Sequence, residues 1–391
     1  MVRHGSPRRL WLPFAAAAAS APPPSSPLYA LTGPGLTDTN ATPPGASWWD
    51  TDLCVPLQAL GATWLVGGDV LDGRAQRGAW LAANAAGLVS PSGGFAAARP
   101  VEWALRAGAD GLPAPLLPRT GASTVPSGFV VVPAAAAGAA TAPSAPLFAF
   151  FMNVTDWRDG VPGNVSAQGL LVRGSAFAPP APPELGEVVF AAAQDAPLVN
   201  AAPVISPLDG YLYIFATALY RASPVFLAQA DATQRAISDQ GVWLWLAAAT
   251  PSGPKWGGPG AEMDAAPLPL GDGSLVGVGE LSAIYHAAAQ RFVLCFFNYS
   301  RVAADALPTM FCMAAPQPWG PWSSPQVVVD GTEAWFPAGA GGPYGGYVLE
   351  PAAPPEAAAA AGGLQIRVTV LLSLWLPYRV FAFETSFDGS G

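Results

Sequence analysis

Two aspartates with the potential for acid–base chemistry flank a short turn in the otherwise apolar stretch WWDTDLCVPLQALGATWLVGGDV, residues 48–70. The apolar runs on either side of the turn near Ala59–Thr63 predict a β-hairpin. Asp52 precedes this turn by about as many residues as Asp69 follows it, so an antiparallel ladder would place the two Cβ atoms roughly 4.5–8 Å apart. Paired carboxylates at that distance are the chemistry of glycosidic-bond hydrolysis.

The same hairpin design recurs along the chain and predicts the architecture that must position these acids. The first strand of each copy begins near Asp52, Ser127, Asn200, Glu280 and Tyr347, at steps of 75, 73, 80 and 67 residues. Each step has room for two further strands, and in the fourth copy these are TMFCMAA and PWGPWSSPQVVV. Four strands repeated five times predict an all-β fold, a five-bladed β-propeller with four-stranded antiparallel blades. A two-domain β-sandwich is the competing architecture, but it gives no reason for the period.

In a propeller the first strand of each blade lines the central channel, so equivalent positions meet at one channel mouth. The candidate catalytic residues at that mouth are Asp52, Asp69 and Glu280. The candidate substrate-binding residues are Trp49, Asn153, Asn200, Arg221, Asn298, Tyr347 and Trp375. Carboxylates, amides, an arginine and aromatic rings together suit the binding of a sugar. The competing interpretation of Asp69 is a turn residue whose carboxylate satisfies backbone N–H groups.

Two mechanisms remain open from the sequence. Two ionised carboxylates this close repel each other, so we expect the pKa of one to be raised. If Asp52 and Asp69 react as a pair roughly 5 Å apart, the reaction retains the anomeric configuration; if Glu280 faces them at roughly 6.5–9.5 Å, Glu280 becomes the acid and the reaction inverts. Asp52 is the nucleophile or base in both. Arg221 would hold a substrate hydroxyl or steady a carboxylate.

A family resemblance rests on TDLCVPLQALGATWLVGGDV, and on GELSAIYHAAAQRFVLCFFNYS, APQPWGPWSSPQVVV, GPYGGYVLEP and LLSLWLPYRVFAFE. These stretches resemble the bacterial endo-D-arabinanase-like propeller family, long catalogued as a domain of unknown function, over about residues 32–384. The resemblance implies a five-bladed propeller that hydrolyses furanoside links in microbial arabinans, with Asp52 and Asp69 as its two motif aspartates. The family glycine after Asp-Leu is Cys54 here, and the family's Phe-Gly-Asp-Thr is Gly67-Gly68-Asp69-Val70.

The net charge and the N-terminal sequence narrow the class of binding partner and the cellular location of the protein. The net charge is −9 and the 17 Lys and Arg residues are scattered, which argues against nucleic acid as a partner. No apolar run is long enough to span a bilayer, and we expect a monomer that binds a polysaccharide or oligosaccharide.

The N-terminal residues MVRHGSPRRLWLPFAAAAASAPPP are typical of a signal peptide cleaved after Ala21, with an organelle transit peptide as the alternative. We therefore expect a secreted or extracellular protein, or one in an organelle lumen. Sequons that favour secretion begin at Asn40, Asn153, Asn164 and Asn298.

The remaining expectations concern domains, cysteines and cofactors. Residues 1–21 are the signal or transit peptide, 22–45 a linker or an outer strand that closes the ring, 46–385 the propeller and 386–391 a tail. Cys295 and Cys312 lie on successive apolar runs and could form a disulfide, but two buried thiols are the preferred interpretation. No cofactor is expected; calcium in the channel would fit the alternative function, a non-catalytic carbohydrate- or protein-binding propeller.

Overall fold

The computed structural model of the protein describes residues 29–30, 48–72, 80–82, 85–89, 115–117, 120–133, 144–157, 165–178, 183–271, 275, 277–299, 308–331, 342–349, 364–375 and 379–390. Positions 29–30, 48–50, 70–72, 80–82 and 85–89 are described by their backbone alone. Antiparallel strands dominate these residues, and the one short α-helix among them is α2, Gln234–Ile237. No helix of the described residues has the length and apolarity to cross a membrane.

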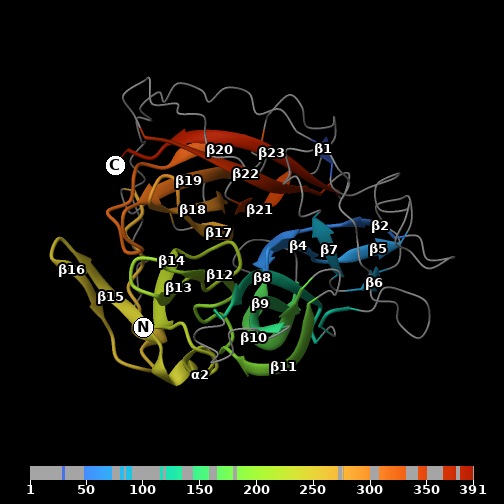
Figure 1. Ribbon diagram of the computed structural model, residues 1–391, viewed down its shortest axis with the longest axis horizontal. Helices are drawn as coiled ribbons and strands as arrows, with labels where there is room; N and C mark the ends of the chain where they lie inside the picture. The colour runs from blue at the N-terminus through green and yellow to red at the C-terminus, as the bar shows by residue number, and fades with distance from the viewer. Residues whose placement is uncertain are drawn as a thin grey trace, which may run out of the picture.

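Four antiparallel sheets of four or five strands follow one another around a common axis (Figure 1). The first contains β8 (Ser123–Val131), β9 (Ser144–Asp156), β10 (Ser166–Phe177) and β11 (Glu184–Ala191). The second contains β12 (Asn200–Ile205), β13 (Tyr211–Thr217), β14 (Val225–Asp231), β15 (Leu244–Thr250) and β16 (Gly253–Trp256). The third contains β17 (Val278–His286), β18 (Arg291–Asn298), β19 (Thr309–Ala315) and β20 (Gln326–Val329). The fourth contains β21 (Pro343–Leu349), β22 (Gln365–Leu374), β23 (Arg379–Asp388) and β1 (Tyr29–Ala30).

Two three-stranded sheets come from the first part of the chain. One consists of β3 (Val55–Ala59), β4 (Ala62–Gly67) and β7 (Ala85–Val89), and the other of β2 (Trp48–Thr51), β5 (Val70–Asp72) and β6 (Trp80–Ala82). Strand β3 contacts β8 on one side and β21 on the other, so the sheet of β3 lies between the first and the last of the larger sheets.

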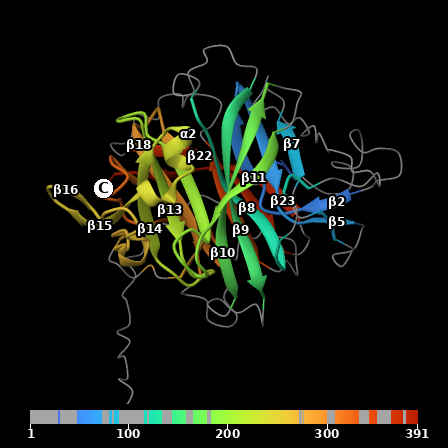
Figure 2. The same cartoon turned by 90° about the horizontal axis from the view of Figure 1, so that it is seen from below.

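The innermost strands β3, β8, β12, β17 and β21 contact one another in this order and close a ring. They surround a cavity of about 350 Å³ whose lining includes residues from all five strands. Figure 2 shows the long strands β8–β11 running side by side along the depth of the ring. The predicted all-β propeller of antiparallel sheets is thus confirmed, with a fifth strand, β16, at the edge of the second sheet.

Apolar side chains that point alternately to the two faces of each strand explain why adjacent sheets stack. In β9, Phe148 and Phe150 pack against the sheet of β12–β15, whereas Ala149 and Phe151 pack on the opposite face. A strand covered on both faces in this way reads as a continuous apolar run. Because no single sheet can cover its own faces, burial of this apolar surface drives the sheets together into the ring.

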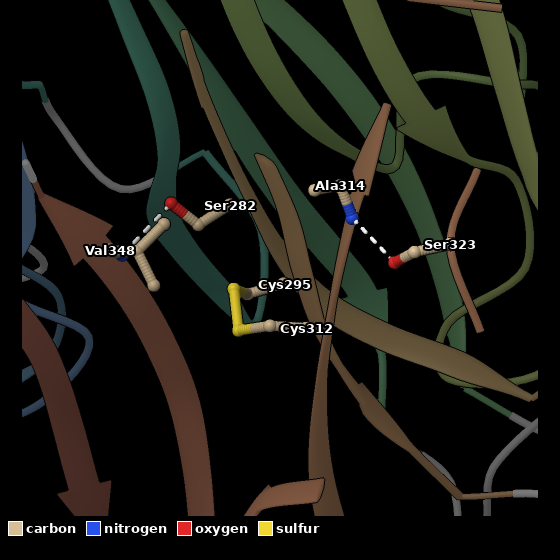
Figure 3. The surroundings of a disulfide bond; sticks show 6 residues. All are labelled: Ser282, Cys295, Cys312, Ala314, Ser323 and Val348. Atoms are coloured by element: carbon tan, nitrogen blue, oxygen red, sulfur yellow. Dashed lines mark hydrogen bonds between the residues drawn. A yellow bond between two sulfur atoms is a disulfide. The ribbon is translucent and has the colours of Figure 1, made fainter. Parts of the chain in front are cut away.

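Buried serines join neighbouring sheets near the axis, where the inner strands diverge. Ser127 Oγ accepts the Ala201 backbone N–H at 3.3 Å, and Ser282 Oγ accepts that of Val348 at 3.0 Å (Figure 3). Ser373 Oγ accepts the Leu53 N–H at 2.9 Å and so ties the last sheet to the first hairpin. At the outer edge of that last sheet, β1 pairs with β23.

Cys295 and Cys312 form a disulfide, so the expectation of two free thiols is wrong (Figure 3). The reason is register: the two residues are direct partners across β18 and β19, with Cα atoms 4.1 Å apart. Partners in an antiparallel ladder can be close enough for a bridge. Cys54 is free and buried, and its burial together with the charge of Asp52 raises the pKa of its thiol.

Candidate active site at the channel mouth

The first hairpin brings Asp52 and Asp69 together as the sequence predicts. The turn consists of Leu60 and Gly61, both at positive φ (48° and 77°), which matches the twist of a tight hairpin. From this turn the strands pair in register as far as Val55 opposite Val66. Beyond the ladder, the Asp69 backbone N–H donates to Asp52 Oδ1 at 2.9 Å. The Asp52 carboxylate and the Asp69 backbone therefore meet at the open end of the hairpin, and each residue is only 5% exposed.

Side chains from the neighbouring sheets orient both carboxylates. The Tyr344 hydroxyl, from β21, donates to Asp52 Oδ2 at 3.1 Å. The Ser123 hydroxyl, from β8, contacts both oxygens of Asp69, at 3.2 and 3.1 Å. The acids are thus held by hydroxyl groups as well as by a backbone amide.

The backbone around Asp52 is closely packed and strained. A Cβ atom on Gly68 would lie 2.3 Å from Asp52 Oδ1, so a side chain at this position would force the carboxylate to move. Leu53, the next residue after Asp52, has φ 58°, in a region that residues with a side chain rarely adopt. Strain of this kind persists where the surrounding structure enforces it, and it concentrates at functional sites.

Glu280 and Arg221 form a buried ion pair in the same region. Arg221 donates to Glu280 Oε1 through Nε at 2.9 Å and through its terminal nitrogen at 2.5 Å, while the Tyr299 hydroxyl donates to Oε2 at 3.0 Å. Burial, the largest single influence, lowers the pKa of Arg221, but the charge and hydrogen bond of Glu280, together with Tyr220 and Tyr299, outweigh it and raise that pKa. The guanidinium lies 4.7 Å from the ring centroid of Tyr220, 4.5 Å from that of Tyr299 and 5.9 Å from that of Tyr344.

Two buried tyrosines connect the ion pair with the aspartate pair electrostatically. Burial raises the pKa of Tyr220, and the charges of Glu280, Asp52 and Asp69 act in the same direction, while Arg221 opposes them. Burial also raises the pKa of Tyr347, again with Glu280 and Asp52 adding to the shift. All three carboxylates therefore influence Tyr220, and Glu280 and Asp52 also influence Tyr347.

The predicted asparagines are all buried. Asn153 Oδ1 accepts hydrogen bonds from Thr124 Oγ1 at 2.9 Å and Thr120 Oγ1 at 3.1 Å. Asn200 begins β12, and its Nδ2 has no hydrogen-bond partner among the described residues. Asn298 ends β18 opposite Val278. Asn153 and Asn298 are each 2% exposed, so neither of these two sequons can carry a glycan in the folded protein; the sequons at Asn40 and Asn164 lie outside the described residues.

The aromatic residues predicted to bind substrate differ in their exposure to solvent. Tyr347 is buried and lines the channel cavity. Trp375 is 55% exposed and its ring centroid lies 6.1 Å from that of Tyr344. The backbone of Trp49 belongs to β2, and its side chain is outside what the structure describes.

The sequence analysis missed Tyr344, Ser123, Tyr220, Tyr299 and Trp157, which complete the site. Tyr344 is close in sequence to the predicted Tyr347, and Tyr220 is next to Arg221. Proximity in sequence to these candidates is therefore the signal by which the two tyrosines could have been found. Ser123 and Trp157 carry no such signal, because their contacts come from the packing of one sheet on another.

Possible metal ligands do not cluster in the part of the chain that the structure describes. There, no group of three or more His, Cys, Asp or Glu side chains is arranged to hold a metal ion. The described lining of the channel cavity is mainly aliphatic, with Gln58, Ser127 and Ser282 among its few polar members.

Comparison with known proteins gives one family and a set of similar folds. A family model described as Domain of unknown function (DUF4185) matches residues 183–384. No curated protein matches the chain. Among solved structures, the α-L-arabinanase of Cellvibrio cellulosa in complex with arabinohexaose is 8% identical, with 88% of this chain and 92% of that chain covered and a TM-score of 0.46.

Two further structures are similar to the same degree. The exo-β-1,3-galactanase of Phanerochaete chrysosporium with β-1,3-galactotriose is 10% identical, with coverage of 90% and 63% and a TM-score of 0.44. A family 43 glycoside hydrolase of Bacillus licheniformis is 11% identical, with coverage of 88% and 73% and a TM-score of 0.46. Their descriptions name an arabinanase, a galactanase and a glycoside hydrolase of family 43.

Proposed function

The chain belongs to the DUF4185 family, and on the geometry of its channel mouth we propose that it is a glycoside hydrolase acting on arabinan-like, furanose-containing polysaccharides. The observation that carries this proposal is the hydrogen bond from the Asp69 amide to Asp52 Oδ1, which joins the two acidic residues at the open end of the first hairpin. The arabinan-type substrate comes from the motif resemblance around Asp52 and Asp69. We also propose that β3, β4 and β7 belong to a fifth blade, and that the protein is secreted, where such polymers occur.

Asp52 is the nucleophile in this proposal and Asp69 the acid and base. Asp52 accepts hydrogen bonds from the Asp69 amide and the Tyr344 hydroxyl, both of which stabilise its ionised form and fix its direction. Asp69 contacts the Ser123 hydroxyl, a group that can both donate and accept. A partner of that kind suits a carboxyl group that gives up a proton to the leaving oxygen and later takes one from water.

Glu280 and Arg221 have a positioning role rather than the role of the acid. Both oxygens of Glu280 accept hydrogen bonds, Oε1 from Arg221 and Oε2 from Tyr299. A carboxylate held in a buried ion pair is not available to donate a proton to a leaving group. Its effect is to hold the Arg221 guanidinium over Tyr344, the residue that orients Asp52.

We predict retention of anomeric configuration. Three covalent bonds separate the Asp69 backbone nitrogen from its carboxyl carbon, and that nitrogen is 2.9 Å from Asp52 Oδ1. On this basis we expect the carboxyl groups at the roughly 5–5.5 Å of retaining enzymes rather than at the roughly 6.5–9.5 Å of inverting ones. Proton NMR of the first-formed product measures this directly. An initial product of opposite anomeric configuration would assign the second acid to another residue.

The experiment for the function itself is incubation with soluble arabinan, arabinogalactan and a fructan, followed by measurement of new reducing ends. We expect release of oligosaccharides from an arabinose-containing polymer by the wild type and none by Asp52→Asn. Equal release by both proteins would remove Asp52 from the mechanism, and no release from any polymer would contradict hydrolysis.

Gly68→Ala provides a test at a residue that carries no chemistry. The added Cβ would lie 2.3 Å from Asp52 Oδ1 and displace the carboxylate from the Asp69 amide. A misplacement of about 1 Å in a catalytic group costs about 10²-fold in rate, so we expect a loss of that order in kcat. Gly258→Ala is the matched control, since a Cβ there meets nothing within 4 Å. Equal rates for the two variants would mean that the position of Asp52 does not matter.

A non-catalytic binding propeller is the second candidate, and the low exposure of the acids favours it. Asp52 and Asp69 are each 5% exposed, which is less than a group in contact with substrate often shows. In that case the polysaccharide binds, Asp52→Asn leaves its affinity within a few-fold of the wild type, and new reducing ends do not form.

A further inference from the structure

An unbroken row of aromatic rings and one guanidinium crosses the channel mouth. It begins at Trp157, directly after β9, whose ring centroid lies 5.6 Å from that of Tyr220. Arg221 lies 4.7 Å from the Tyr220 ring and 5.9 Å from the Tyr344 ring. The row ends at Trp375, directly after β22, 6.1 Å from Tyr344. The two ends thus come from different sheets of the ring.

The row is buried in its middle and exposed at both ends. Tyr220 and Tyr344 are 4% and 7% exposed, whereas Trp157 and Trp375 are 37% and 55% exposed. Tyr344 also donates its hydroxyl to Asp52, so the proposed nucleophile is attached to the buried middle of the row. The exposed tryptophans are therefore the two ends of a row whose middle holds the Asp52 carboxylate.

The ring geometry leaves indole surface open. Trp157 meets Tyr220 at an interplanar angle of 89°, and Trp375 meets Tyr344 at 65°. Because neither pair is parallel, the tyrosines hold the tryptophans in place without stacking over them. A single exposed tryptophan needs no explanation. Two that are anchored by the same row, at its opposite ends, form a built surface.

We propose that Trp157 and Trp375 are two stacking platforms that bind a polysaccharide chain on both sides of the bond that is cleaved. Indole faces pair with the apolar faces of sugar rings, while the edges of the rings remain in water. This inference rests on the proposed function and adds to it the substrate class: an extended chain that enters and leaves the mouth, and is cut internally. An enzyme that removes terminal sugars needs a platform on one side only.

The test is affinity electrophoresis with soluble debranched arabinan and, separately, arabinogalactan in the gel. All variants carry Asp52→Asn, so that binding is measured without turnover. We expect Trp157→Ala and Trp375→Ala each to weaken binding about 10-fold, and the double variant about 100-fold if the platforms act independently. Met263→Ala is the control, because Met263 is exposed and has no place in the row.

The outcomes separate this inference from the proposed function. Affinities equal to that of the control in both tryptophan variants overturn the platforms, even if the wild type cleaves the polymer. Weakened binding without any cleavage by the wild type keeps the platforms and removes the hydrolase. An effect in one tryptophan variant only contradicts a chain that crosses the mouth, and absence of binding to both polymers contradicts both proposals.

Discussion

Asp52→Asn is expected to lower kcat by about 10⁴-fold or more on a polysaccharide that the wild type cleaves. Asparagine has nearly the same shape and its amide oxygen can still accept the Asp69 N–H, so the fold and the position of Asp69 are preserved. What is lost is the negative charge that attacks the anomeric carbon. Asp69→Asn should cost about 10²–10⁴-fold, because it removes acid–base assistance and leaves the nucleophile.

The measurement is kcat and KM for both variants, with circular dichroism and a thermal melt to confirm folding. Tyr344→Phe is the matched control, since it removes one hydrogen bond to Asp52 and keeps the ring; we expect a loss of about 10-fold. Activity within 10-fold of the wild type in both aspartate variants would contradict the assignment. A larger effect of Tyr344→Phe than of Asp52→Asn would transfer the central role to the tyrosine.

Glu280→Gln should destabilise the protein by about 2–3 kcal/mol, less than the about 3–5 kcal/mol of a fully buried pair, because it leaves the Arg221 charge without its partner. Glu280 is 2% exposed and the Arg221 side chain 20%, so water offsets part of the loss. Arg221 has no second carboxylate among the hydrogen bonds described for it. The Tyr299 hydroxyl would also lose an ionised acceptor. Equilibrium unfolding in urea measures the change in free energy.

A surface ion pair of the same kind provides the comparison. Arg173 and Glu187 are joined at 2.5 Å across β10 and β11, but their side chains are 43% and 66% exposed. Glu187→Gln should therefore change the free energy of unfolding by less than about 1 kcal/mol. Equal small effects of Glu187→Gln and Glu280→Gln would mean that water reaches Arg221 freely and that the ion pair does not organise the site.

The features that could be predicted from the sequence are those that depend on local geometry within one hairpin. The pairing of Asp52 with Asp69 follows from a two-residue turn and from the alternation of apolar residues on both sides of it, all within one hairpin. The propeller follows from the repetition of that hairpin design. Both inferences need only the period of a strand and the rule that the ends of a hairpin meet.

The contacts that complete the site are long-range, and no local pattern encodes them. Tyr344 and Asp52 are 292 positions apart and meet only because the last sheet closes the ring against the first. Arg221 was a candidate from the sequence, but its partner Glu280 is 59 positions away on the next sheet, and their pairing depends on how the two sheets stack. The same applies to Trp157. The Cys295–Cys312 disulfide depended on an exact register that the spacing of two apolar runs does not give.

The most direct test of the proposed mechanism is a crystal structure of Asp52→Asn with a bound arabinan oligosaccharide. We predict a chain that crosses the channel mouth, with the glycosidic oxygen about 3 Å from an Asp69 oxygen and the anomeric carbon facing residue 52. A chain bound away from the mouth, or one whose glycosidic oxygens all lie beyond hydrogen-bonding distance of Asp69, would contradict the proposal.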